Sequence, residues 1–260
     1  MSLTSRTLFV ACAIGTFSLY FVLAGSLFYF FRTDTFLQVL WSQRTLFTVR
    51  LSVLAATLAT FLAILVAVPS AYALSRYEFP GKRIVDTMLE LPMIVSPAAL
   101  GAMILIFFNN PAGMWIQEHC IQFVFSWRGI VLAQFVTVCG ISTRLIKAAM
   151  DEIPRRYGEV ARTLGASPWK AFCTIDLPLC RRGILAASIL TWAKALGEFG
   201  ATILVAGSMQ QRTETLPIAI FLRLSSAEIE ATVVLILLLL FIGLCTLYAV
   251  RVLTEGKAHA

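Results

Sequence analysis

Charged side chains are scarce in this 260-residue chain, where Asp, Glu, Lys and Arg together make up 13% of the residues. Soluble proteins carry about 25%, so the composition argues against a soluble domain. Histidine occurs twice, and neither an HExxH nor a Gly-x-Ser-x-Gly pattern is present. The Walker pattern GxxxxGK(S/T), which holds nucleotide phosphates, is also missing. We therefore expect no enzyme active site here, and any ATP that drives this protein must bind another chain.

The six cysteines show no spacing that suggests a disulfide framework or a zinc site, because none of them belongs to a CxxC pair. Glu118, His119 and Cys120 follow one another and could be imagined as metal ligands. Three consecutive side chains converge on one ion with difficulty, so a solvated loop is the preferred interpretation. We predict no metal site and no cofactor in this chain.

Apolar residues make up 59% of the chain, and the mean hydropathy is +0.84. A transmembrane helix needs about 20 such residues in succession. Six windows of this kind occur along the sequence, at residues 7–31, 51–75, 91–117, 129–150, 183–207 and 231–250. They predict an all-α, polytopic membrane protein with about six transmembrane helices, forming a single domain over residues 1–260.

Lys and Arg are unevenly distributed between the segments that connect these windows. If the N-terminus is cytoplasmic, 14 of them lie on the cytoplasmic side and 6 on the outer side. Short connections rich in Lys and Arg stay in the cytoplasm, which predicts a multi-pass protein of the cell membrane with both termini inside. The net charge of +7 is then a consequence of topology, and no nucleic-acid partner is expected.

A polar segment at about residues 151–182 lies on the predicted cytoplasmic side. If a helix runs from about residue 154 to 164, apolar side chains recur on one of its faces at i, i+3, i+4 and i+7, namely Tyr157, Val160, Ala161 and Leu164. Gly165 follows where a helix end favours left-handed backbone, and Ser167 with Pro168 provides an N-cap and a first-turn proline for a second helix. These residues predict a sharp corner. Periodicity alone fits an ordinary surface helix equally well.

Six positions of this segment resemble the EAA signature of ABC importer permeases: Glu159, Ala161, Gly165, Ile175, Leu177 and Pro178. In that family the cytoplasmic loop docks into a cleft on a separate ATP-hydrolysing subunit. The resemblance implies that a compact group of residues couples this chain to its ATPase: Glu159, Ala161, Leu164, Gly165 and Ala166.

Further stretches resemble molybdate permeases in particular. They are FPGK from residue 79, LELPMIVSPAALGAMIL from residue 89, FSWRGIVLA from residue 125 and KALGEFGATILVAG from residue 194. EAA-type loops occur in importers of many solutes, whereas GEFGAT is typical of the group that transports molybdate, tungstate and sulfate. The resemblance implies import of a tetrahedral oxyanion by alternating access, most closely molybdate, with tungstate and sulfate or thiosulfate as alternatives.

The resemblance also implies the type I ABC importer fold and a set of partners. These are a second copy of the permease in a homodimer, two cytoplasmic subunits that bind ATP and Mg, an extracytoplasmic substrate-binding protein, and the surrounding membrane lipid. Relative to five-span members of the group, the window at residues 7–31 is an extra helix at the periphery. The core helices then cover residues 51–252.

Two prolines lie inside the window at residues 91–117. Pro92 and Pro97, with Ser96 between them, can break a membrane helix and expose backbone polar groups to a water-filled path. The same prolines could equally produce a passive kink. Either a gate or a kink is therefore expected at this position.

Two charged residues lie inside the window at residues 183–207. Lys194 and Glu198 are spaced i, i+4, and each costs about 2.5–3.5 kcal/mol to insert at the centre of a membrane helix. We expect them to reach one another on one helix face. They form either a structural pair that neutralises itself, or a site where Lys194 offsets the charge of a dianion and Glu198 holds it in position.

Two other classes of membrane protein compete with an importer subunit. An ion-coupled secondary transporter needs paired intramembrane carboxylates or inverted repeats, and this chain offers Asp86, Glu90 and Glu198 but no visible repeat. A membrane scaffold leaves the EAA-like segment unexplained, and a membrane-embedded enzyme would need the catalytic residues that are missing.

Overall fold

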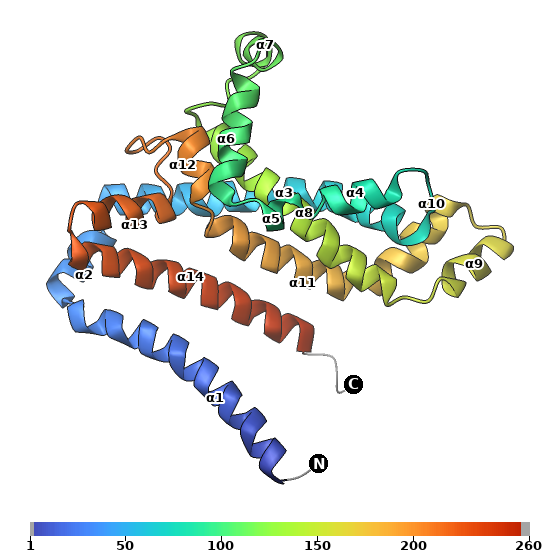
Figure 1. The fold of residues 1–260 in the computed structure, drawn as a ribbon, viewed down its shortest axis with the longest axis horizontal. Helices are drawn as coiled ribbons and strands as arrows, with labels where there is room; N and C mark the ends of the chain where they lie inside the picture. Colours follow the sequence, from blue (N-terminus) through green and yellow to red (C-terminus); the bar gives the residue numbers. More distant parts are fainter. Residues whose placement is uncertain (1–2, 256–260) are drawn as a thin grey trace.

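The computed structural model describes residues 3–255, and these residues are helical with no β-strand among them. Three long helices form the centre: α3 (Gln43–Arg76), α8 (Trp127–Asp151) and α11 (Leu177–Leu196). A fourth, α14 (Ile229–Glu255), packs beside α11 (Figure 1). The prediction of an all-α protein is confirmed.

Small side chains line the face of α3 that packs against α8 and α11. They recur at helical spacing and are fully buried: Ala56, Ala59, Ala63, Ala67 and Ala71. Val138 and Ile146 of α8 fill the space opposite them. Lipid is as apolar as leucine, so membrane helices gain stability from the close backbone approach that small residues allow. The alanine face therefore explains why α3 and α8 form the central contact.

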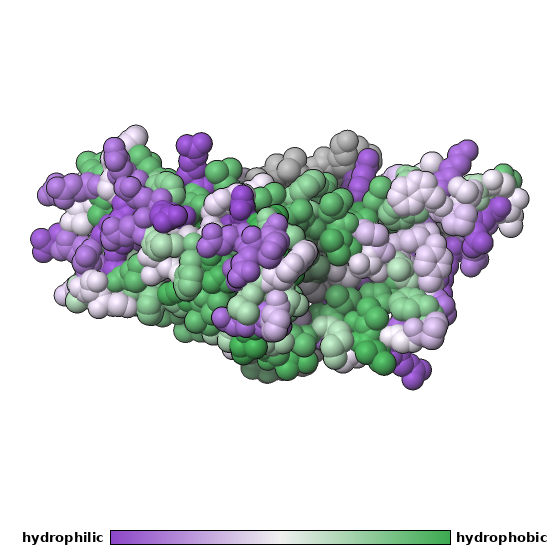
Figure 2. Space-filling view, turned by 90° about the horizontal axis from the view of Figure 1, so that it is seen from above, coloured by the Kyte–Doolittle hydropathy of each residue, from purple (hydrophilic) through white to green (hydrophobic). Residues whose placement is uncertain are grey.

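Apolar helices of membrane-spanning length are found along the described chain. Four are single helices, at Thr7–Phe30, Gln43–Arg76, Trp127–Asp151 and Ile229–Tyr248, and two bent pairs of helices raise the number to six. On the face seen in Figure 2, hydrophilic residues gather toward the two ends of the long axis and hydrophobic residues dominate between them. About six spans were predicted, and two of them are broken.

The first bent pair takes the place of the span predicted at residues 91–117, in which Pro92 and Pro97 had led us to expect a break or a kink. The chain instead forms α4 (Lys82–Met88), α5 (Leu91–Ile94), α6 (Pro97–Phe108) and α7 (Pro111–His119). The segment made of α4 and α5 meets α6 at 113°. As a result α6 and α7 project away from the long helices, with α7 at the tip of the projection (Figure 1).

The first bend lies at Val95 and Ser96, where the backbone is extended. The residue before a proline is pushed out of the helical region, so Ser96 cannot carry the helix into Pro97. Ser96 caps the new helix instead, because its Oγ accepts a hydrogen bond from Ala99 N at 3.3 Å. Pro97 takes the first position of α6, and Pro92 lies in the first turn of α5. The break is therefore a change of helix rather than a kink within one.

The second bent pair corrects the prediction of a continuous helix over residues 183–207. Helix α11 ends at Leu196, and α12 (Gly200–Ala206) continues at an angle of 58°. Gly200 packs against the start of α6, where a Cβ built on it would lie 2.9 Å from the backbone nitrogen of Ala98. A side chain at this position would collide with backbone, so glycine is required for the approach. The two breaks therefore meet where the start of α12 packs on the start of α6.

The N-terminal helix α1 (Leu3–Ser26) stands apart from the long helices (Figure 1). From residue 7 onward its side chains are exposed, except that Ala24 is half-buried. A short turn η1 (Leu27–Phe30) and α2 (Thr33–Leu40) lead into α3, at the same end of the molecule as α13 (Leu216–Ser225). Residues 1–2 and 256–260 lie outside the described part, and the cytoplasmic position of both termini stays a prediction.

Candidate functional site

The polar segment expected at residues 151–182 forms a helical loop at one end of the molecule (Figure 1). It contains α9 (Arg156–Thr163), α10 (Pro168–Ala171) and a π-helical turn η2 (Phe172–Asp176), which runs directly into α11. We call this segment the EAA-like loop. The helix expected from residue 154 to 164 is thus present and slightly shorter.

Gly165 forms the corner between α9 and α10. Its φ of +89° lies in the left-handed region, as the sequence predicted, and nothing lies within 4 Å of a Cβ built on it. Ser167 Oγ accepts a hydrogen bond from Lys170 N at 3.2 Å, and Pro168 occupies the first position of α10. The predicted corner is confirmed. Glycine is required here by backbone conformation and not by internal packing.

Large apolar side chains are exposed on the EAA-like loop. Four of them form what we call the apolar tip: Tyr157, Val160, Leu164 and Trp169. Leu164 is 83% exposed and Trp169 is 72% exposed. Glu159 is also exposed, whereas Ala161 and Ala166 are half-buried beside the tip. Exposed apolar groups gathered on an otherwise polar loop are typical of a surface that contacts another protein or a membrane.

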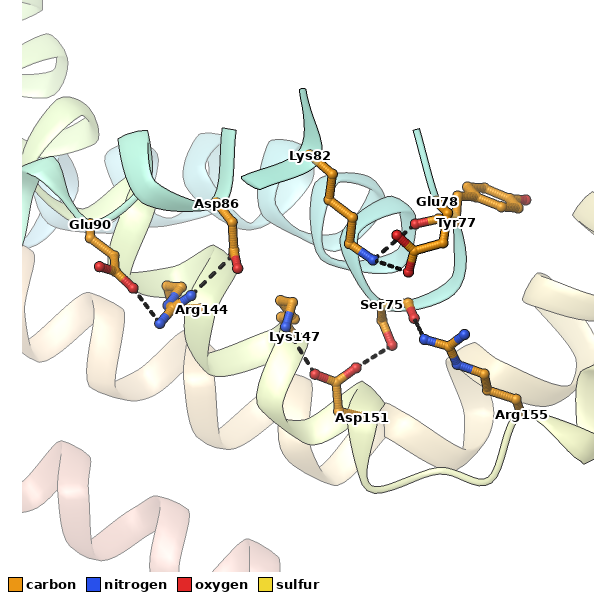
Figure 3. Close-up of polar contacts among 10 residues, drawn as sticks. All are labelled: Ser75, Tyr77, Glu78, Lys82, Asp86, Glu90, Arg144, Lys147, Asp151 and Arg155. Atoms are coloured by element: carbon orange, nitrogen blue, oxygen red, sulfur yellow. Dashed lines mark hydrogen bonds and ion pairs between the residues drawn. The ribbon is translucent and has the colours of Figure 1, made fainter. Parts of the chain in front are cut away.

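A buried ion pair joins the base of the EAA-like loop to the end of α3. Arg76 Nη2 lies 2.8 Å from Asp176 Oδ1, with the two side chains 9% and 4% exposed. Arg76 also donates a hydrogen bond to the carbonyl oxygen of Ile153 at 3.0 Å. Beside it, Arg155 Nη2 donates to the carbonyl oxygen of Ser75 at 2.7 Å (Figure 3). We call Arg76, Asp176, Arg155 and Ser75 the loop clamp.

The loop clamp continues into the end of α8. Asp151 accepts a hydrogen bond from Ser75 Oγ at 2.6 Å and one from Lys147 Nζ at 3.1 Å (Figure 3). The loop, α3 and α8 are therefore held together at one point. Sequence reasoning missed the clamp because Arg76 and Asp176 are 100 residues apart. The available signal was an arginine directly after the hydrophobic window at residues 51–75 and an acid in the polar segment before the window at residues 183–207.

A second group of ion pairs holds the bent segment of α4 and α5 against α8. Arg144 lies between Asp86 and Glu90 and pairs with both, with Nη1 3.1 Å from Asp86 Oδ1 (Figure 3). The helices also approach closely at Gly140, where a built Cβ would lie 2.3 Å from the carbonyl oxygen of Leu89. Two of the three acids that an ion-coupled transporter could use are thus already paired with Arg144.

Lys194 and Glu198 do not form the pair expected from their spacing. Helix α11 ends at Leu196, so the two residues lie on either side of a break rather than on one helix face. Glu198 is 2% exposed, and its Oε1 accepts a hydrogen bond from Ala201 N at 3.1 Å. Lys194 is exposed, and its side chain makes no ion pair with any side chain of residues 7–248. The carboxylate therefore supports the start of α12, and the ammonium group is left free.

Buried polar atoms without a hydrogen-bond partner in the described chain occur on the helices next to the second break. They include Thr191 Oγ1 on α11, Thr202 Oγ1 on α12 and Gln134 Oε1 on α8. Each such group costs about 1–3 kcal/mol when it is buried without a partner. Two further atoms of this kind, Thr48 Oγ1 and Thr60 Oγ1, lie on α3, so unpartnered polar groups are not confined to the second break.

Two arginines at the opposite end of the molecule are paired with acids. Arg44 Nη2 lies 2.7 Å from Glu214 Oε1, and the Glu214 side chain is completely buried. Arg32 Nε lies 3.0 Å from Glu230 Oε1 in a much more exposed pair. Within residues 3–255, no group of three His, Cys, Asp or Glu side chains is placed to hold a metal ion.

Comparison with known sequences relates this chain to transport proteins. Residues 59–258 match the family described as binding-protein-dependent transport system inner membrane component. The sulfate transport system permease protein CysW of Escherichia coli (strain K12) is 36% identical over 186 residues, or 71% of this chain and 64% of that protein. The molybdenum transport system permease protein ModB of Haemophilus influenzae (strain ATCC 51907 / DSM 11121 / KW20 / Rd) is 35% identical over 182 residues. The match covers 68% of this chain and 79% of that protein. ModB of E. coli (strain K12) is 38% identical over 156 residues, which cover 58% of this chain and 67% of that protein.

Comparison with solved structures finds the same fold. A bacterial ABC transporter involved in the import of the acidic polysaccharide alginate superimposes with a TM-score of 0.79, covering 98% of each chain at 17% sequence identity. The inward-facing MetNI methionine ABC transporter gives a TM-score of 0.62 at 16% identity, covering 83% of this chain and 98% of that one. At such identities the likeness concerns the fold alone.

Proposed function

Because the chain belongs to the family of inner membrane components of binding-protein-dependent transport systems, we propose that it is the membrane-spanning permease subunit of an ATP-driven importer. We propose a tetrahedral oxyanion as the solute, since similar proteins are named as sulfate and molybdenum permeases. Molybdate is our first candidate, and tungstate, sulfate and thiosulfate are the alternatives. All four are dianions of similar shape.

The observation that carries this proposal is the EAA-like loop, in which an exposed apolar tip stands on a buried clamp. Leu164 and Trp169 would enter a cleft on a cytoplasmic ATP-binding subunit, where burial of their apolar surface favours association. The clamp would pass the movement of that subunit to α3 and α8 through Arg76. Gly165 would let the two chains approach closely. ATP and Mg would bind to the partner subunit and not to this chain.

The assembly we propose lies in the cell membrane and contains two copies of this chain, two ATP-binding subunits and an extracytoplasmic binding protein. Its orientation can be tested with the exposed Cys120 and the half-buried Cys173, in a functional background that lacks the other cysteines. A membrane-impermeant thiol reagent should label Cys120 in intact cells and Cys173 only after lysis. Labelling of Cys173 in intact cells would reverse the proposed topology.

The solute path would pass the place where the two helix breaks meet. A dianion loses a large hydration energy in hydrocarbon, so the path needs donors and positive charge in a water-filled space. Lys194 is exposed beside the second break and free of Glu198, and an ionisable residue at membrane depth faces an aqueous cavity or a partner. Because Gly200 packs on Ala98, a movement of α12 would move α6 as well. Pro92, Ser96 and Pro97 would then belong to the gate.

Uptake by the reconstituted assembly tests the proposed solute. Proteoliposomes that contain the permease, its ATPase and the cognate binding protein should accumulate radiolabelled molybdate only when ATP is present inside. Unlabelled tungstate, sulfate and thiosulfate, added in turn as competitors, rank the alternatives. A lack of ATP-dependent accumulation of any of these anions would refute the oxyanion importer.

A double variant tests the role of Lys194. Lys194→Met should reduce oxyanion uptake severalfold even when Glu198→Gln is introduced with it, because the lost charge is the one that faces the solute. Assembly and basal ATP hydrolysis should stay intact. If the double variant transports normally, Lys194 does not belong to the path.

A further inference from the structure

A cleft opens at the end of the molecule opposite the EAA-like loop. It has a volume of about 390 Å³ and lies where the segment before α8 meets the segment after α12. Next to the cleft, the segment before α8 is joined to the end of α12 by a hydrogen bond from Phe125 N to Val205 O at 3.0 Å. We call this the outer cleft. The residues that line it include Gln122, Phe125, Trp127, Gln211 and Arg212.

Two residues of the outer cleft have strained backbone. Phe125 has φ +56° and Gln211 has φ +55°, in the left-handed region that side-chain-bearing residues avoid. Such strain is unfavourable and persists where the surroundings hold it, most often at functional sites. Here the hydrogen bond to Val205 holds Phe125, and the ring of Phe125 lies over Gly207, close to the position of a Cβ built there. Gln211 and its neighbour Arg212 both line the cleft.

The outer cleft carries an unbalanced positive charge. Arg212 is exposed and makes no ion pair with the side chains described, those of residues 7–248, and none of the residues that line the cleft is Asp or Glu. Arg44 and Arg32, at the same end of the molecule, are neutralised by their own acids. The comparison shows that carboxylates are available at this end and that Arg212 is left without one.

The other side chains of the outer cleft suit an anion. Gln122 and Gln211 are exposed, and their amide groups can donate hydrogen bonds. Phe125 and Trp127 provide an apolar wall that reduces water access and strengthens an electrostatic contact. A guanidinium group presents its N–H donors in a fork that matches two oxygens of a tetrahedral oxyanion.

We propose that the outer cleft is a binding site for a small tetrahedral oxyanion, held by Arg212 with the amides of Gln122 and Gln211. The identity of the anion rests on the proposed function. The cleft lies one short helix, α12, away from Lys194, so an anion bound there would wait at the entrance of the path. Its binding is weak because the donors are exposed, which is appropriate for a site that must pass its ligand on.

Equilibrium binding to the complete permease–ATPase complex tests this site. The complex is placed in lipid nanodiscs without ATP and without the binding protein, and radiolabelled molybdate and sulfate are the probes, with chloride keeping the ionic strength constant. Arg212→Gln should weaken binding roughly tenfold or more, as expected for the loss of a charge-assisted hydrogen bond. The matched control is Arg50→Gln, because Arg50 is exposed on α3 but does not line the cleft. It should leave binding unchanged.

The outcomes separate the site from the proposed function. Weaker binding in the Arg212 variant alone supports the site, whichever anion the assembly transports. Equal weakening in both arginine variants would mean a diffuse surface charge and would overturn it. If the wild-type complex transports an oxyanion but binds none under these conditions, the site is wrong and the importer stands.

A second variant guards against misfolding of the arginine variant. Gln211→Gly removes one amide donor and also relieves the left-handed strain. It should raise the thermal stability of the complex and weaken oxyanion binding at the same time. Higher stability with unchanged oxyanion binding would show that Gln211 does not bind the anion and that its backbone strain does not serve the site.

Discussion

Gly165 in the EAA-like loop and Gly200 at the contact between the two helix breaks are required for different reasons. Gly165 has left-handed backbone and open space around it, whereas Gly200 leaves no room for a Cβ next to Ala98. The loop is thus shaped by its own residues and is open to a partner. The interior is shaped by contacts between distant segments. A change in the loop should damage coupling, and a change in the interior should damage folding.

The loop clamp should show the largest effect on stability, since it is the one part of the loop that is built like the interior. Arg76→Met leaves Asp176 buried without its partner, which should destabilise the permease by about 3–5 kcal/mol. The double variant Arg76→Met with Asp176→Asn should recover much of this loss, because a lone buried charge is worse than none. Thermal unfolding in detergent measures both. Equal losses in the single and double variants would contradict a buried pair.

Gly200→Val should show the next largest effect on stability. It tests whether the contact between the two helix breaks is needed for folding. The new side chain meets the backbone of Ala98, and overpacking of this kind costs about 1–3 kcal/mol. The yield of monodisperse permease in size-exclusion chromatography should fall. Gly243→Val is the matched control, because a built Cβ at Gly243 of α14 has nothing within 4 Å. A normal yield of the Gly200 variant would show that the two breaks are not tightly packed.

Gly165→Asp should leave the permease folded and abolish solute-stimulated ATP hydrolysis. The left-handed backbone costs a side chain on the order of 1 kcal/mol, and the added carboxylate obstructs docking of the apolar tip. Glu159→Lys should act in the same direction. Gly81→Asp is the matched control, since Gly81 also has positive φ and open surroundings but lies outside the EAA-like loop. Equal solute-stimulated ATP hydrolysis in the Gly165 and Gly81 variants would show that the EAA-like loop does not couple the permease to the ATPase.

Arg32→Ala should show the smallest effect, because its ion pair with Glu230 is largely exposed. Exposed pairs contribute about 0–1 kcal/mol, so neither the unfolding temperature nor oxyanion uptake should change measurably. A large loss of uptake with normal stability would instead place Arg32 in contact with the binding protein.

The local parts of this structure could be predicted from the sequence. The corner at Gly165 and the cap at Ser167 depend on residues within one helical turn, and both are present as expected. The break at Pro97 was expected in position but not as a 113° turn into a projecting helix. That angle depends on how α6 packs on α12 at Gly200, which no window of neighbouring residues contains.

Hydropathy, charge bias and helix signals by themselves determined that this is an all-α membrane protein with an EAA-like loop, because these signals act over one helix or one turn. Only the tertiary structure decided which charges meet. It separated Lys194 from Glu198 by ending α11 between them, and it joined Arg76 to Asp176 across 100 residues of chain. An ion pair needs two side chains within a few ångströms in space, and spacing along the sequence predicts that distance only while the helix continues.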